Sequence, residues 1–172
     1  MDSANAQRST YGHLELREAV GDLFFVWSAT EQAIRNQIEV LDPTSDTAKI
    51  QGISRSINHL KKLHYDVAQG RVNHLLAIDE VIQFLSDALA DRNLIAHGIR
   101  GWHGNIDHDA AILLLELDER QKELSLASLR STNDKLSIVA FQLSRLTYAA
   151  THPDKPGIDN IYDDIVGRIR KR

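Results

Sequence analysis

Long stretches free of helix-breaking residues constrain the fold of this chain most. Only 3 prolines and 9 glycines occur among its 172 residues, and Pro43, Pro153 and Pro156 all stand between periodic segments. Because proline ends or kinks a helix, these positions separate elements rather than interrupt them. Apolar residues that recur every three or four positions predict long helices over residues 13–41, 45–68, 73–97 and 129–150.

The pattern changes between the third and the fourth of these helices. Short segments at residues 98–102, 110–117 and 123–127 are separated by turn-prone residues at 104–105 and 118–121. Such spacing predicts a small antiparallel β-meander. The expected fold is therefore mainly α, an antiparallel helical bundle with a β-insert at about residues 98–127 after the third long helix.

Three segments make up the expected organisation of the chain. Residues 1–12 are expected to be a flexible N-terminus, and residues 13–151 the bundle with its insert. A linker and a short C-terminal helix then occupy residues 152–172, with Ile158, Ile161, Ile165 and Ile169 aligned on one face of that helix.

Composition excludes several classes of protein. The chain has no cysteine, which excludes disulfides, thiolate metal sites and cysteine nucleophiles. Its longest uncharged apolar run is far shorter than the roughly 18 residues of a membrane span, and the polar N-terminus does not resemble a signal peptide. We therefore expect a cytoplasmic protein with no membrane partner. The net charge of −4 argues against a surface that coats nucleic acid broadly.

Two charged residues interrupt the apolar stripes of the predicted helices. Glu31 falls on the stripe of the first helix, and Arg92 falls on that of the third. The apolar positions of the first stripe are Val20, Phe24, Trp27, Ile34, Ile38 and Leu41, and those of the third are Leu75, Ile78, Ile82, Leu85, Leu89 and Ala96. Burying an unpaired charge costs several kcal/mol, so such groups pair with one another or reach water. The sequence thus predicts either an ion pair between Glu31 and Arg92 or a wet cleft that both side chains line.

Arg92 begins a segment that carries groups suited to phosphodiester chemistry. Arg92 offers a planar fork that fits a phosphate, and Asn93 can donate to a phosphate oxygen or orient an imidazole. His97 lies at the end of the predicted helix, where the helix dipole favours its protonated form by roughly 0.3–1 kcal/mol. These three residue types suffice to handle a phosphodiester without a metal or another cofactor.

The segment Arg92-Asn93-Leu94-Ile95-Ala96-His97 resembles the signature of the HEPN domain family, an arginine followed after four to six residues by a histidine. The resemblance covers roughly residues 13–150 and implies a helical bundle that forms a homodimer. It also implies a metal-independent endoribonuclease, a hydrolase of single-stranded RNA in which the ribose 2′-hydroxyl is the nucleophile. Carried over, His97 and Arg92 would be catalytic and Asn93 would support them, while Glu31 resembles an acidic residue that faces the arginine in some members.

Two functions stay open on this basis. The first is the ribonuclease, in the setting of a toxin–antitoxin or phage-defence system and with an antitoxin or another protein as its partner. The second is a non-catalytic HEPN-like module that binds a nucleotide or a protein partner, in which Glu31 and Arg92 form a structural pair.

The predicted insert holds further candidates for contact with RNA. Residues 92–104 contain arginines and histidines but no acid, so the negative net charge does not argue against a small electropositive cleft there. Arg100, Trp102 and His103 are the candidates there, although packing is the commoner role of a tryptophan. His103, Asp107, His108 and Asp109 fit no standard ligand spacing, so we expect no metal site. The basic C-terminal residues 168–172 are expected to be a solvated helix end.

Overall fold

The computed structural model describes the backbone of residues 3–104 and 111–170, and their side chains apart from those of residues 3–11 and 48. The structure is mainly helical and contains one three-stranded antiparallel sheet, as predicted. Its helices are α1 (Ser3–Leu41), α2 (Ile53–Ala68), α3 (Val72–Gly98), α4 (Leu126–Thr151) and α5 (Ile158–Arg170), with a 3₁₀ turn at Thr47–Lys49. Within the described residues, no helix is both long enough and apolar enough to cross a bilayer.

The chain divides into two compact units. The first unit comprises Met1–Val26 and Ala90–Asp134, and the second comprises Trp27–Leu89 and Lys135–Arg172. The first unit thus holds the beginning of α1, the end of α3 and the whole sheet. The second unit holds the remaining parts of the long helices together with α2 and α5.

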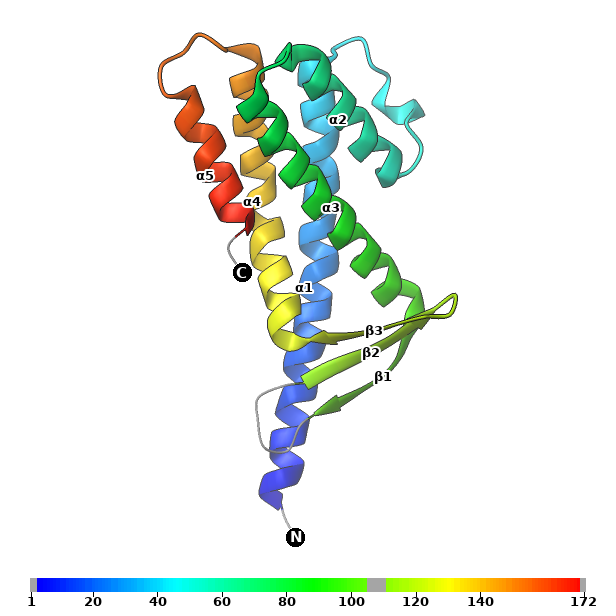
Figure 1. Cartoon of the computed structure of the whole chain (residues 1–172). Coiled ribbons are helices and arrows are strands. Elements are labelled where there is room, and N and C mark those ends of the chain that lie inside the picture. The colour runs from blue at the N-terminus through cyan, green and yellow to red at the C-terminus, as the bar shows by residue number, and fades with distance from the viewer. Residues whose placement is uncertain (1–2, 105–110, 171–172) are drawn as a thin grey trace. The chain divides into compact units, whose positions relative to one another are not determined.

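The sheet of the first unit follows the chain order β1–β2–β3 (Figure 1). Its strands are β1 (Ile99–Gly104), β2 (Ala111–Leu117) and β3 (Arg120–Ser125). β2 alternates between buried and half-buried side chains, so Ala111, Leu113 and Leu115 face the unit's core while the residues between them form the outer face. Alternation of this kind is what a sheet covered on one face requires.

The buried line of α1 includes Trp27, Ile34 and Ile38 of the predicted stripe, but at three other stripe positions the buried residue is the one before. The residues at its centre are Leu16, Ala19, Leu23, Trp27, Thr30, Ile34 and Ile38. Phe24 and Glu31, which the spacing had placed on the stripe, are only half-buried. Because Leu23 and Phe24 are both apolar, the sequence pattern fitted two neighbouring lines, and the structure uses the one that passes through Leu23.

Helix α3 shows the same one-residue difference at its end. Ile95 is buried and Ala96 is exposed, although the predicted stripe had placed Ala96 inside. Arg92 is half-buried, at the edge of the buried face. Its charge therefore lies beside the core and not in its centre.

One arginine in the second unit joins the ends of two helices. Arg71 precedes α3, and its guanidinium donates to the carbonyls of Val67 and Ala68 at the end of α2 and of Ala149 and Ala150 near the end of α4, at 2.9–3.1 Å. The last carbonyls of a helix have no partner within the helix. Arg71 therefore satisfies such groups on two helices, a role that its sequence position did not indicate.

Candidate functional site

The described structure places Arg92, Asn93 and His97 on the last two turns of α3, in the first unit. Arg92 is held from two sides. Its guanidinium carbon lies 5.3 Å from the centre of the Phe24 ring of α1, and its Nη1 donates to Oδ1 of Asn93 at 3.1 Å. A cation over an aromatic face gains about 0.5–2 kcal/mol, more as it is desolvated. Phe24 and Asn93 therefore fix the direction of the guanidinium.

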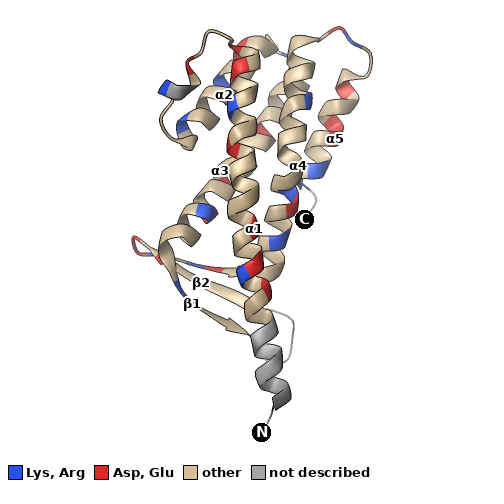
Figure 2. Cartoon of the chain, turned by 180° about the vertical axis from the view of Figure 1, so that it is seen from behind, with Lys and Arg blue, Asp and Glu red and all other residues tan. Residues whose placement is uncertain are grey.

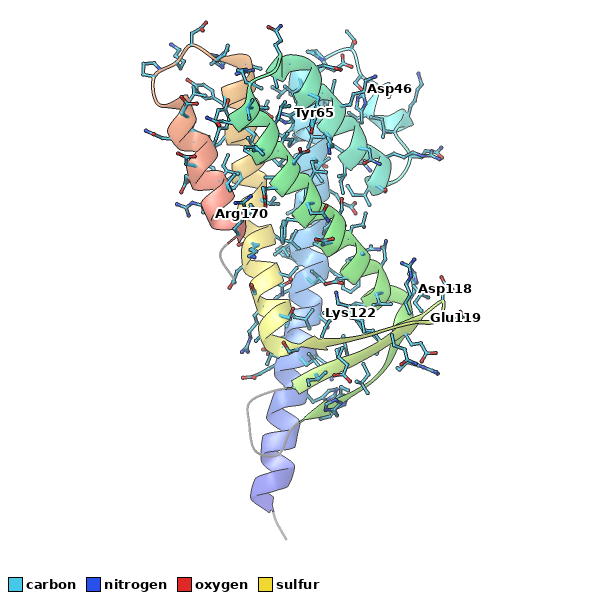
Figure 3. The ribbon with its side chains drawn as sticks, in the orientation of Figure 1. Asp46, Tyr65, Asp118, Glu119, Lys122 and Arg170 are labelled. Atoms are coloured by element: carbon cyan, nitrogen blue, oxygen red, sulfur yellow. The ribbon has the colours of Figure 1, made fainter. Side chains whose placement is uncertain are left out.

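The charge of Arg92 is not neutralised within its own unit. Among the described residues of that unit, no carboxylate lies within ion-pair distance of its guanidinium, and its buried Nε has no hydrogen-bond partner. The neighbouring carboxylate of Asp91 pairs instead with Lys122 of β3, which Figure 3 labels. Because no carboxylate of its described unit pairs with it, the half-buried guanidinium of Arg92 is a group able to receive an anionic ligand.

His97 lies in the last turn of α3 and is exposed. It stands five positions after Arg92, which corresponds to about 140° around an ideal helix. The two side chains therefore leave α3 in different directions. His97 is exposed, while the half-buried Arg92 places its guanidinium over the ring of Phe24.

Gly98 is the point at which the end of α3 contacts the sheet. A Cβ atom at this position would lie 2.7 Å from the carbonyl oxygen of Glu116 and 3.2 Å from Cβ of Leu117. Both contacts are with β2, and the shorter one is with backbone, which cannot move aside cheaply. Because Gly98 has no side chain, the end of α3 can lie against β2, and the preceding residue, His97, therefore stands next to the end of this strand.

Glu31 belongs to the second unit, and its partner was not foreseen. Its Oε1 accepts a hydrogen bond of 2.7 Å from Nε1 of Trp27, one turn earlier on α1. Positions four apart share a helix face, so this pairing could have been inferred from the sequence. The hydrogen bond from the indole of Trp27 therefore explains why the carboxylate of Glu31 can be half-buried.

The candidates for RNA contact in the sheet differ in what already holds them. Arg100 donates from Nε and Nη2 to Oε2 of Glu116 at 3.0 and 2.8 Å. The ring of Trp102 stacks on His13 of α1, with 4.7 Å between centroids, so one of its faces is covered by packing. His103 is exposed and stands opposite Ile112 in the strand pairing. Asp107, His108 and Asp109 lie outside the described residues.

Sequence reasoning missed a chain of buried polar groups in the second unit. His64 of α2 and His74 of α3 are both fully buried. Nδ1 of His64 lies 3.0 Å from Nε2 of His74, whose Nδ1 lies 3.3 Å from the Tyr162 hydroxyl. Burial lowers the pKa of His64 to about 3, with His74 as a second cause, and burial followed by the charge of Arg71 lowers the pKa of His74 to about 4.

Titratable groups also fail to gather into a metal centre in the described ranges. No group of three or more histidine, aspartate or glutamate side chains there is arranged to hold an ion.

Comparison with models of protein families, with curated proteins and with solved structures gives no match to this chain.

Proposed function

We propose that this protein is a HEPN-like, metal-independent endoribonuclease that cleaves single-stranded RNA. One observation carries the proposal: α3 ends with an exposed histidine and, five residues before it, an oriented arginine that no carboxylate of its described unit neutralises. A phosphodiester is an anion whose cleavage needs a cation at the phosphate and a group that transfers protons. Arg92 and His97 supply these two functions.

The chemistry that follows is internal transfer at phosphorus. The ribose 2′-oxygen attacks the adjacent phosphorus, the bond to the 5′-oxygen breaks, and a 2′,3′-cyclic phosphate and a 5′-hydroxyl are formed. In this proposal His97 acts as an acid–base group for the protons of these oxygens, while Arg92 stabilises the charge that develops on the phosphate. Asn93 acts as a positioning residue through its hydrogen bond to Arg92.

The resemblance to the HEPN family implies that two copies of the motif meet in a homodimer. The 140° between Arg92 and His97 on one helix fits this arrangement, because a second copy supplies side chains from another direction. The proposed active form is therefore a homodimer.

Cleavage of a labelled single-stranded RNA in the presence of a chelator tests the proposal. We expect the wild-type protein to release fragments with cyclic-phosphate ends and the His97→Ala variant to lose at least a hundredfold in rate, as for the loss of a general acid or base. His152→Ala is the matched control, since His152 is also an exposed histidine at the end of a long helix, α4. Unchanged cleavage by His97→Ala, in protein whose circular dichroism matches the wild type, would refute the assignment.

One observation favours the non-catalytic module as the second candidate. The guanidinium of Arg92 is already engaged by Phe24 and Asn93, which is also how a purely structural arginine is held. For a module of this kind, the wild-type protein would show no cleavage of any RNA offered. Arg92→Ala would then change only the stability of the first unit.

A further inference from the structure

The first strand of the sheet contains a bulge three residues after His97. Ile99 stands opposite Leu115 and Gly101 opposite Leu114, so Arg100 is an extra residue in β1. A bulge redirects side chains and often lies beside a functional site. Here it directs Arg100 to the outer face of the sheet, where the guanidinium meets Glu116.

Gly101 puts no side chain on this outer face opposite the half-buried Leu114 of β2. Apart from its two chain neighbours, a Cβ at Gly101 would meet no atom within 4 Å. A hollow of about 370 Å³, whose lining includes Leu114 but not Gly101, lies over β2 and β3, and we call it the sheet hollow. Its lining consists of Arg100, Leu114, Leu115, Glu116, Gln121, Lys122 and Glu123. Its volume falls within the roughly 300–1,000 Å³ of small-molecule sites.

The polar rim of the sheet hollow presents acceptors beside donors. Oε2 of Glu116 receives Nε and Nη2 of Arg100 and, at 3.4 Å, Nε2 of Gln121. Among the described residues, Oε1 of Glu116 receives no hydrogen bond. Glu123 adds a second carboxylate opposite Leu114. β1 and β2 carry one charged residue each, Arg100 and Glu116, so the rest of these two strands is free of charge (Figure 2).

We propose that the sheet hollow binds an unpaired guanine base of the RNA. A guanine offers two adjacent N–H donor groups next to the O6 acceptor on one edge. The carboxylates of Glu116 and Glu123 match the donors, the side chains of Arg100 and Gln121 match O6, and Leu114 supplies an apolar surface for the flat face of the ring. The two carboxylates of the lining are balanced by Arg100 and Lys122, so the hollow offers a phosphate no net positive charge and suits a base better than the backbone.

The position of the sheet hollow makes it a specificity site for the reaction proposed above, and this part of the inference rests on that function. Gly98 holds the end of α3 on β2, so His97 stands at a fixed place next to the strand that forms the floor of the hollow. Single-stranded RNA is read in this way, by contacts to the edges of unstacked bases. Cleavage is accordingly expected next to guanosines.

Binding of mononucleotides tests the sheet hollow without any cleavage. The four nucleoside monophosphates GMP, AMP, CMP and UMP are titrated by calorimetry into the His97→Ala variant of the full chain. We expect GMP to bind at least tenfold more tightly than the other three. Adding Glu116→Gln should remove this preference, because an amide offers a donor where guanine needs an acceptor.

The chain offers a close control for Glu116. Glu80 of α3 also accepts Nε and Nη2 of one arginine, Arg170, on a single oxygen. The exposed fractions of the two glutamate side chains, 33% for Glu116 and 31% for Glu80, are nearly equal. Glu80→Gln should therefore leave the affinity for GMP unchanged, so that a loss confined to Glu116→Gln reports on the hollow and not on a broken ion pair.

A second variant keeps the test informative if Glu116→Gln does not fold. Gly101→Val adds a side chain beside Leu114 in free space and alters no charge, and it should abolish GMP binding. Equal binding of all four nucleotides, or GMP binding that survives Gly101→Val, would overturn the inference. If the wild-type protein cleaves RNA without base preference and GMP does not bind, only the proposed guanine site is refuted. If GMP binds but no RNA is cleaved, only the proposed ribonuclease activity is refuted.

Discussion

Gly98 has no side chain, and this lets the end of α3, with His97, lie close to β2. In Gly98→Ala the new Cβ would lie 2.7 Å from the carbonyl oxygen of Glu116, so α3 and β2 must separate. Forcing one extra carbon into close packing typically costs 1–3 kcal/mol. We expect Gly98→Ala to lower the free energy of unfolding by about 2 kcal/mol in urea titrations and to displace His97.

Gly21→Ala is the control for this substitution. Gly21 is an exposed glycine of α1, and a Cβ there would meet no atom within 4 Å. Since alanine is the better helix former by about 1 kcal/mol, this variant should be neutral or more stable than the wild type. Equal stability of Gly98→Ala and Gly21→Ala would show that the contact with β2 does not constrain the motif.

For individual residues, the sequence placed Arg92, Asn93 and His97 at the end of a helix, but it did not give the side chains that contact them. The position of Arg92, Asn93 and His97 at a helix end followed from periodicity and from the glycine after them. Phe24 beneath Arg92 could not be inferred, because a rotation of α1 by one residue decides whether Leu23 or Phe24 points to the core. Such a rotation depends on packing between elements, which a single helical period does not determine.

The hairpin between β2 and β3 turns through two residues with left-handed backbone. Asp118 and Glu119, labelled in Figure 3, have φ angles of 48° and 65°. A two-residue hairpin turn of this kind favours Asn-Gly, because a left-handed conformation costs a residue with a side chain roughly 1–2 kcal/mol. Glu119→Gly should therefore raise the free energy of unfolding by about 1 kcal/mol.

Thermal unfolding followed by circular dichroism measures this effect. Glu119→Ala is the control, because alanine has the same difficulty with positive φ as glutamate and should bring no gain. A decrease in stability in Glu119→Gly would mean that the turn is not strained by its side chain.

The elements that the sequence misplaced are those whose boundaries depend on unusual turn residues. The second helix was predicted from residue 45 but begins at Ile53, because Gly52, with φ of 85°, interrupts the helical backbone. The third strand was predicted from residue 123 but begins at Arg120, since the acidic pair at 118–119 forms a tight turn usually made by asparagine and glycine. The helix over 13–41 was predicted to its correct end, and the structure extends it to Ser3 at the other side.

At the scale of the whole molecule, folding buries two histidines in a chain of hydrogen bonds. If Tyr162 donates to Nδ1 of His74, then His74 must donate from Nε2 to Nδ1 of His64. The proton of His64 then lies on Nε2, which is buried and has no partner among the described residues. With the protons of this chain running in the opposite direction, Nε2 of His64 is an acceptor without a partner among the described residues. In both arrangements a further proton on His64 would add a buried charge with no anion to receive it.

The stability of the fold should consequently fall as the solution becomes acidic. Folding lowers the pKa of His64 from 6.5 to about 3 and that of His74 from 6.5 to about 4, so below about pH 6.5 the unfolded chain binds protons that the folded chain refuses. The free energy of unfolding therefore decreases with falling pH, by up to about 1.4 kcal/mol per pH unit for each histidine. Between pH 7 and pH 5, above the range in which carboxylates titrate, we expect a loss of about 2–4 kcal/mol in urea unfolding.

His152→Asn, which removes an exposed histidine, should keep this slope, and His64→Phe should reduce it. A free energy of unfolding that does not change between pH 7 and pH 5 would contradict the burial of the two neutral imidazoles.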